Sequence, residues 1–280
     1  MGLAAERIDM ADHPRDLLKK FGLQPKHSWG QNFLSDEGVL ERIADEAALR
    51  PGEPCVELGP GLGHLTRFLL ATGAKVTAVE RDRDMVKVLE RQKLEGLTLV
   101  EGNAAELDFA KTANADQVVV VGNLPYHLSS PILFEVLDQA KHVSRAVFTL
   151  QKEVVERVAA PAGTREGGVL TVMLALHFHA ENVFDVPAAM FHPPPNVDSA
   201  VLKLTRRPRP LAEVKDEARF RKVVKAGFAQ RRKTLSNSLK SDKTLSADWA
   251  PVLEKAGIDG TRRAETLSVE EFAAIERALG

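Results

Sequence analysis

The stretch Cys55-Val-Glu-Leu-Gly-Pro-Gly-Leu-Gly-His-Leu-Thr66 joins a short apolar run to a glycine loop and then to a helical pattern. Glycines let the backbone turn tightly and approach a ligand closely. The loop reads G-x-G-x-G, one residue shorter than the G-x-G-x-x-G fingerprint of dinucleotide-binding enzymes. Glycine loops are also common as purely structural turns, so this loop indicates a ligand site only in combination with the elements around it.

Valine-rich apolar runs surround this loop and alternate with helical patterns. Strands are predicted at 55–58, 75–80, 97–102, 117–122 and 145–151, and helices at 65–73, 84–94 and 130–139. Nearly continuous apolar strands separated by helices are typical of a parallel sheet that is covered on both faces. The pattern therefore predicts a doubly wound, Rossmann-like α/β domain. A late strand is predicted at 199–207.

The charge is distributed unevenly along the chain. The formal net charge is −1, but the segment from Lys203 to Lys243 holds 14 Lys and Arg against four acids, or +10. The rest of the chain therefore carries −11. Such a concentration points to a polyanionic partner, although a solvated helix face would give the same pattern.

Arg206-Arg-Pro-Arg-Pro210 predicts a domain boundary, with domains at 1–208 and 209–280. The second domain is expected to be entirely helical, with amphipathic runs at 217–229 and 268–279.

An acidic residue ends the second predicted strand. Glu80 follows Gly59 by 21 residues, where a carboxylate accepts hydrogen bonds from both hydroxyls of a ribose. Because no Lys in the loop is available to hold a phosphate, we expect S-adenosylmethionine rather than a dinucleotide. Asn103, after the third strand, would accept a hydrogen bond from the cofactor's adenine amino group, or would simply form a turn.

The stretch Gly122-Asn-Leu-Pro-Tyr-His-Leu-Ser-Ser130 ends the fourth predicted strand and holds the single tyrosine. The exocyclic amine of a base is a poor nucleophile because its lone pair is delocalised into the ring. The Asn123 side-chain oxygen and the Leu124 carbonyl would accept its two N–H bonds and free that lone pair. Pro125 fixes φ, and Tyr126 would stack on the extruded base. The alternative is a strand-ending turn with a buried ring.

Several classes of protein are excluded or disfavoured. The single Cys55 excludes an internal disulfide and a cysteine-based zinc site. His177 and His179 flank Phe178 at strand spacing but lack a third ligand, so we predict no metal. No apolar run reaches the ~18 residues of a membrane span, and the first residues lack a signal-peptide core. We therefore expect a soluble cytoplasmic protein.

The motifs together resemble those of the ribosomal RNA adenine N6-dimethyltransferases. The NLPY stretch, ELGPGLGHLT at 57–66 and VERD at 79–82 carry the resemblance, which covers nearly the whole chain. Residues 27–34 (HSWGQNFL) are similar to the family's Q-N-F-L segment, and 191–199 (FHPPPNVDS) to its F-x-P-P-P-x-V-D-S loop. Residues 229–238 (AQRRKTLSNS) are similar to its basic Q-R-R-K-T helix.

The resemblance implies a role for each matching residue. The implied cofactor contacts are Asn32, Leu34, Gly59, Gly61, Glu80, Asn103 and Asn123. The implied catalytic group is Asn123, Leu124, Pro125 and Tyr126. Phe191 would face the target base, while Arg231, Arg232 and Lys233 would bind RNA. The family usually has Asp where this chain has Asn103, so that hydrogen bond would be neutral.

Within the family, the similarity favours the bacterial branch that makes two adjacent N6,N6-dimethyladenosines near the 3′ end of small-subunit ribosomal RNA. The expected partners are therefore ribosomal RNA and the small subunit or its precursor, and we expect a monomer. The alternatives are the resistance-type enzymes acting on large-subunit RNA and an assembly factor whose turnover is secondary. A small-molecule or DNA methyltransferase is disfavoured by the +10 segment and by the NLPY context.

Overall fold

A computed structural model describes residues 12–230, 232–245 and 247–280. The chain divides into two compact units. Unit 1 comprises Met1–Val155 and Asn182–Leu204, and unit 2 comprises Glu156–Glu181 and Thr205–Gly280.

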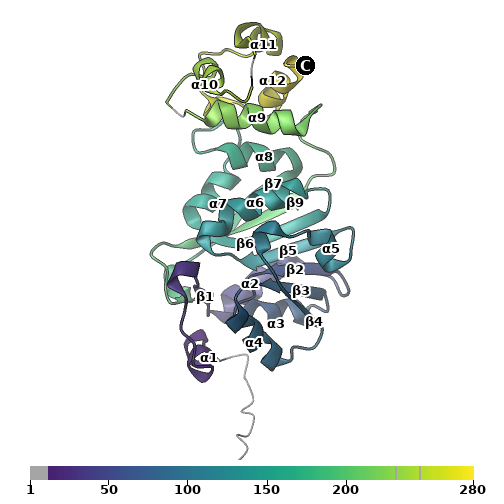
Figure 1. Cartoon of the computed structure of the whole chain (residues 1–280), viewed down its shortest axis with the longest axis vertical. Helices are drawn as coiled ribbons and strands as arrows, with labels where there is room; N and C mark the ends of the chain where they lie inside the picture. The colour runs from purple at the N-terminus through teal and green to yellow at the C-terminus, as the bar shows by residue number, and fades with distance from the viewer. Residues whose placement is uncertain (1–11, 231, 246) are drawn as a thin grey trace, which may run out of the picture. The chain divides into compact units, whose positions relative to one another are not determined.

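A seven-stranded sheet forms the centre of unit 1, in the order β4-β3-β2-β5-β6-β9-β7 (Figure 1). Its strands are β2 (Pro54–Leu58), β3 (Lys75–Glu80), β4 (Leu97–Glu101), β5 (Val118–Asn123), β6 (Val143–Gln151), β7 (Phe178–Val186) and β9 (Ser199–Arg206). The neighbouring pairs β4-β3, β3-β2, β2-β5 and β5-β6 are parallel, which confirms the predicted α/β fold.

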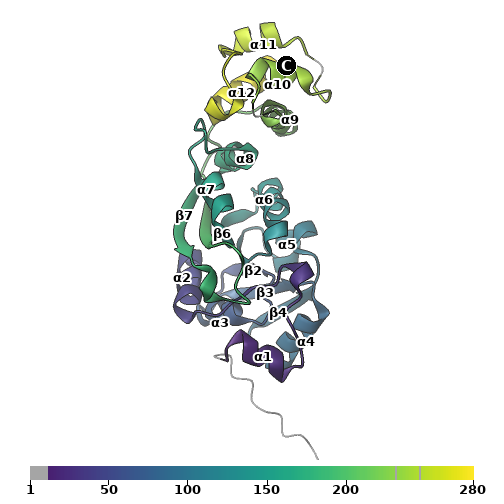
Figure 2. The same ribbon diagram turned by 90° about the vertical axis from the view of Figure 1, so that its left-hand side faces the viewer.

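Burial on both faces explains why the central strands are apolar throughout. Val118, Val119, Val120 and Val121 of β5 are each at most 1% exposed, so alternate side chains pack on opposite faces. One face contacts helices α2 (Glu37–Ala47) and α3 (His64–Ala71) in a shared apolar cluster. Helices α5 (Phe109–Ala113) and α6 (Ser129–Asp138) lie on the opposite side from α2 (Figure 2).

The late strand β9 lies between β6 and β7 and runs opposite to both. The Lys152 amide donates to the Asp198 carbonyl at 3.0 Å, where β6 ends and β9 begins. The Arg207 amide donates to the His177 carbonyl at 2.7 Å, where β9 ends and β7 begins. The parallel sheet therefore acquires an antiparallel edge, as in many large α/β sheets.

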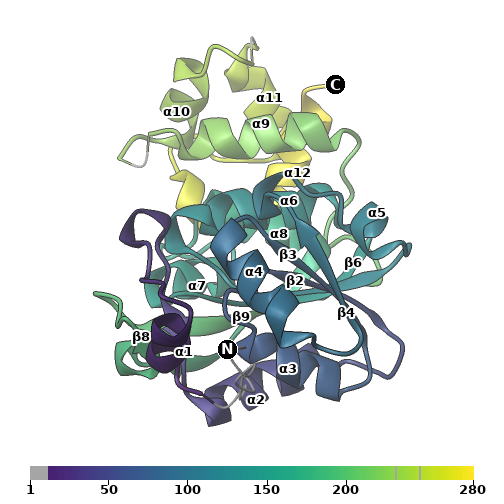
Figure 3. The same cartoon turned by 60° about the horizontal axis from the view of Figure 1, so that its bottom comes forward.

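The N-terminal region of the described chain adds elements that the sequence patterns did not predict. Helix α1 (Pro14–Lys20) buries Leu17 and Leu18 against the start of helix α4 (Arg83–Gln92). The short strand β1 (Phe33–Leu34) pairs antiparallel with β8 (Phe191–His192). Figure 3 shows α1 beside β8, where the rings of His13 and His192 lie 5.5 Å apart.

Unit 2 is helical beyond β9, as predicted for the C-terminal part of the chain. Its helices are α8 (Val169–His177), α9 (Glu217–Phe228), α10 (Leu235–Ser241), α11 (Trp249–Ala256) and α12 (Val269–Ala278); α7 (Lys152–Ala159) begins in unit 1. The Glu276 carboxylate is fully buried and accepts from the Lys215 and Asp216 amides and from the Arg219 guanidinium. It therefore fixes the start of α9 against α12.

Two local predictions were wrong. His177 ends helix α8 rather than lying in a strand, so His177 and His179 do not share a strand face. In the segment similar to the family's basic helix, residues 229–230 and 232–234 form a turn, because α9 ends at Phe228 and α10 begins only at Leu235; residues 235–238 belong to α10. Arg232 and Lys233 are exposed in this turn, and Arg231 lies outside the described residues.

No helix in the described part of the chain is long and apolar enough to span a membrane. Among the same residues, no group of three or more His, Cys, Asp or Glu is placed to hold a metal ion.

Candidate active site

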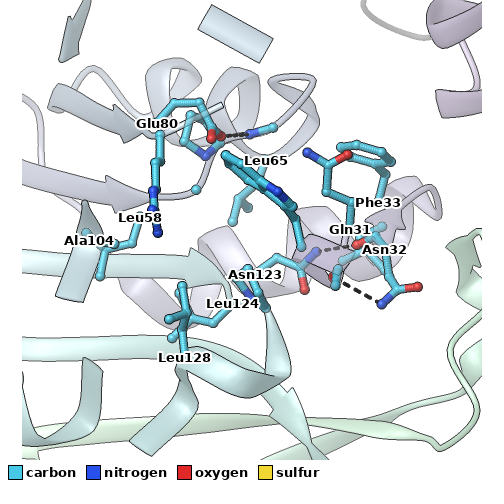
Figure 4. A pocket seen from close by; sticks show the side chains of 18 of the residues that line it. Gln31, Asn32, Phe33, Leu58, Leu65, Glu80, Ala104, Asn123, Leu124 and Leu128 are labelled. Carbon is cyan, nitrogen blue, oxygen red and sulfur yellow. Dashed lines mark hydrogen bonds between the residues drawn. The ribbon is translucent and has the colours of Figure 1, made fainter. Parts of the chain in front are cut away.

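The predicted site residues of unit 1 meet around a cavity of about 290 Å³. Because β2, β3, β4 and β5 are parallel, their carboxyl ends lie at one edge of the sheet, and the segments that follow them line the cavity. Figure 4 shows Glu80 on one side of the cavity and Asn123 and Leu124 on another. Asn32, Leu34, Gly59, Gly61, Asn103, Pro125, Tyr126 and Phe191 also line it.

The glycine loop requires glycine at two of these positions. Gly59 and Gly61 have φ of 67° and 56°, a left-handed conformation that other residues rarely adopt. A Cβ on Gly61 would also lie 3.0 Å from the Phe33 ring. The loop therefore stays close to Phe33 and leaves its backbone facing the cavity.

Glu80 is 8% exposed and serves as an acceptor for the glycine loop. Its Oε2 accepts from the Gly61 amide at 3.1 Å, and its Oε1 accepts from the Asp82 amide at 2.8 Å. Burial raises the pKa of Glu80, and these backbone hydrogen bonds oppose the rise. A carboxylate has about four acceptor positions, so these amides do not use all of them.

Asn103 lies at the cavity as predicted, but its side chain also makes local bonds. Its Oδ1 accepts from the Ala105 amide at 3.2 Å, capping a 3-10 helix at Ala104–Glu106, and its Nδ2 donates to Glu106 Oε1 at 2.8 Å. The structure therefore shows the turn role, and the ligand role stays a prediction that the second lone pair of the amide oxygen allows.

Tight packing fixes the NLPY stretch at the end of β5. A Cβ on Gly122 would lie 2.6 Å from the Leu58 carbonyl oxygen, so only glycine fits there. The Leu124 amide donates to the Thr149 carbonyl at 3.2 Å. Asn123 Nδ2 donates to the Asn32 carbonyl at 3.1 Å, which leaves its Oδ1 as the acceptor of the amide.

Tyr126 stands between the first cavity and a second one of about 310 Å³. Asn32 and residues 193–197 also line the second cavity. The Tyr126 hydroxyl lies 2.8 Å from Ser199 Oγ, and Ser199 is fully buried. This hydrogen bond fixes the ring of Tyr126 while its face remains available to a ligand.

Residues that sequence reasoning missed surround the predicted ones. Ser199 fixes Tyr126, Arg81 lines the cavity next to Glu80, and Lys26 contacts Asp82. Arg81 and Asp82 lie in VERD and Ser199 ends the 191–199 loop, but no local pattern indicated their contacts, and Lys26 carried no signal. Glu57 is buried behind the glycine loop, and burial raises its pKa to about 8.

Comparison with known proteins gives a consistent result. The family model described as ribosomal RNA adenine dimethylase matches residues 22–279. The ribosomal RNA small subunit methyltransferase A of Myxococcus xanthus is 66% identical, with 96% of each chain covered. That of Bacillus cereus is 40% identical, with 97% of each chain covered.

Two solved structures have similar folds. A dimethyladenosine transferase from Plasmodium falciparum has a TM-score of 0.72 at 26% identity, covering 87% of this chain and 95% of that one. The 23S rRNA methyltransferase ErmE has a TM-score of 0.68 at 30% identity, covering 89% and 99%. With the family model matched over nearly the whole chain and the site motifs gathered around one cavity, this chain belongs to the ribosomal RNA adenine dimethylase family.

Proposed function

We propose that this protein transfers methyl groups from S-adenosylmethionine to N6 of two adjacent adenosines near the 3′ end of small-subunit ribosomal RNA. The observation that carries the proposal is the position of Tyr126, which lines both cavities and follows Asn123 and Leu124 in the lining of the first. The names of the relatives in Myxococcus xanthus and Bacillus cereus support the small-subunit target.

The residues around the first cavity suit S-adenosylmethionine. The remaining acceptor capacity of Glu80 suits the hydroxyls of a ribose, and Asn103 retains a lone pair for an adenine amino group. The left-handed glycine loop allows the backbone to approach the ligand closely. When bound, this cofactor supplies an electrophilic methyl group on a sulfonium.

The protein's own part in the reaction is to prepare the target amine. Asn123 Oδ1 and the Leu124 carbonyl would accept the two N–H bonds of N6, which localises the lone pair on the nitrogen. Tyr126, with its hydroxyl held by Ser199, would stack on the base. Burial raises the pKa of Tyr126, with the Ser199 hydroxyl opposing, so the ring remains a neutral phenol that need not act as a base.

RNA affinity would come mainly from unit 2. Within the +10 segment, Lys203 pairs with Glu46 and Arg219 with the buried Glu276, so these two cations are already engaged. Exposed Arg232 and Lys233 are better candidates for phosphate contacts, together with Arg231. The variant that replaces these three by Gln is called the triple-glutamine variant below.

The test is single-turnover methylation of small-subunit particles with saturating cofactor. Asn123→Ala should slow the reaction by about 10²- to 10³-fold, as for the loss of one electrostatic stabiliser. Asn182→Ala, at an exposed position of β7, is the control and should react normally. A near-normal rate in the Asn123 variant would rule out the amine-acceptor mechanism.

Target choice needs a separate experiment, because the fold is shared with a 23S rRNA methyltransferase. Mass spectrometry of ribosomal RNA from a deletion strain should show loss of dimethyladenosine from the small-subunit RNA only. Loss from large-subunit RNA would instead favour the resistance-type function. If the protein were an assembly factor whose turnover is secondary, its deletion would cause a growth or assembly defect that the Asn123 variant rescues.

We also propose that the protein acts in the cytoplasm as a monomer.

A further inference from the structure

The segment at residues 26–34, called the strap below, crosses the cofactor cavity and is fastened at both ends. At its far end, Phe33 and Leu34 pair with β8, and just beyond it Ser35 bonds to the Met190 carbonyl through its amide and its hydroxyl. Its near end is attached differently, by a charged cluster that joins Lys26 to the loop between β3 and α4. All of these residues belong to unit 1.

The charged cluster is a closed set of short hydrogen bonds. Lys26 Nζ donates to Asp82 Oδ1 at 2.6 Å and to Asp84 Oδ2 at 2.7 Å. Gln31 Nε2 donates to Asp82 Oδ2 at 2.6 Å, while Gln31 Oε1 accepts from the Lys26 amide at 2.9 Å. Because Asp82 is 2% exposed, its charge needs such partners, and removing one leaves a buried carboxylate undercompensated.

The strap in turn contacts the group that would accept the target amine. The Asn32 carbonyl accepts from Asn123 Nδ2 at 3.1 Å, so the position of the strap fixes which way the Asn123 amide faces. An amide held by its nitrogen presents its oxygen on the other side, where the amine must bind. Figure 4 shows this bond, with Gln31, Asn32 and Phe33 along the same wall of the cavity.

We propose that Lys26 is a positioning residue for methyl transfer: by tying the strap to Asp82 and Asp84, it holds the Asn32 carbonyl where it orients the Asn123 oxygen toward the target amine. This inference rests on the proposed function, since it assigns a task to the Asn123 oxygen. The Asp82 amide also donates to Glu80 Oε1, so the same anchor supports the ribose side of the cavity.

The activity test compares two lysines that face the same aspartate. Lys26→Met removes the anchor, whereas Lys87→Met removes an exposed lysine of α4 that lies outside the strap, 4.0 Å from Asp84. We expect Lys26→Met to slow single-turnover methylation about 10- to 100-fold at saturating cofactor and particles, because misplacing a reacting group by about 1 Å has that effect. Lys87→Met should stay within about twofold of wild type, and Lys26→Arg should recover most of the rate.

The strap also carries its own reporter, which needs neither cofactor nor RNA. Trp29 is 39% exposed, and its ring centroid lies 5.4 Å from Lys26 Nζ, whereas the other tryptophan, Trp249, is 2% exposed. Quenching of fluorescence by acrylamide, which is neutral and therefore insensitive to the lost charge, thus reports mainly on Trp29. Quenching should rise in Lys26→Met and stay unchanged in Lys87→Met.

The outcomes separate this inference from the proposed function. A Lys26→Met protein with normal quenching and a normal rate would overturn the inference. Increased quenching with a normal rate would overturn it as well. If Asn123→Ala itself reacts normally, the proposed mechanism fails, yet increased Trp29 quenching in Lys26→Met would still establish the anchor. Should Lys26→Met not fold, Lys26→Gln, which keeps a donor but no charge, is measured in its place under the same criteria.

Discussion

Glu80→Ala tests the cofactor site most directly, because this carboxylate has two tasks. It holds the glycine loop through the Gly61 and Asp82 amides, and it would hold the ribose through its remaining acceptor positions. The matched control is Glu101→Ala. Glu101 pairs with Glu80 in the β3–β4 register, but its side chain is 49% exposed.

The two tasks predict two separate effects of Glu80→Ala, one on cofactor affinity and one on the free energy of unfolding. Losing charge-assisted bonds to the ribose should weaken cofactor binding by about 1–3 kcal/mol, a rise in Kd of about 5- to 150-fold. Leaving two buried amides without acceptors costs about 1–3 kcal/mol each, partly offset because a buried charge disappears, so stability should fall by about 2–4 kcal/mol. Glu101→Ala should change neither quantity by more than about 0.5 kcal/mol.

Calorimetric titration gives Kd, and denaturant unfolding without cofactor gives the change in stability. Burial raises the pKa of Glu80 above the usual 4.5, with the Asp82 and Gly61 amides opposing. The wild-type carboxylate therefore takes up a proton at a higher pH than an exposed one, and cofactor affinity should begin to fall at a pH above 4.5 on acidification. Unchanged Kd in Glu80→Ala would remove Glu80 from the cofactor site, and lost stability without lost affinity would leave it a purely structural residue.

Asn103→Asp should bind cofactor at least as tightly as wild type in the same titration, because a charged acceptor makes a stronger bond and exposed Glu106 is able to swing away; a large loss would show that Asn103 does not accept from the cofactor. The triple-glutamine variant should flatten the dependence of log affinity for RNA on log salt by about 1–2 units without changing cofactor affinity. An unchanged slope would place the polyanion site elsewhere. Because burial raises the pKa of Glu57 to about 8, the folded protein holds this proton more tightly than the unfolded chain, and this residue makes stability fall as pH rises from about 4.5 to about 8. Glu57→Gln should therefore raise Tm at about pH 8.5 and leave it nearly unchanged at about pH 5, whereas an equal shift at both pH values would contradict burial as the cause.

The amino-acid sequence by itself determined the α/β fold and the edge of the sheet where the site lies. Residues 118–121 are apolar because both faces of β5 are covered. Such a local pattern can be recognised in the sequence without knowing how the rest of the chain folds. The parallel order of the strands then brings their carboxyl ends together, so Gly59, Glu80 and Asn123 were predictable as neighbours although they are far apart in sequence.

The tertiary structure alone decided how these residues are held. The antiparallel insertion of β9 between β6 and β7, the bond from Tyr126 to Ser199 and the anchor of Lys26 on Asp82 each join segments that are not consecutive in the sequence, and the two side-chain contacts span 73 and 56 residues. No local periodicity records such a pairing, because it depends on which side chains meet after the chain has folded. The same reason explains why residues 229–234 were predicted as part of a basic helix. In the described part of that segment, the Gln230 amide donates to Ser238 Oγ at 3.2 Å, eight residues further along the chain.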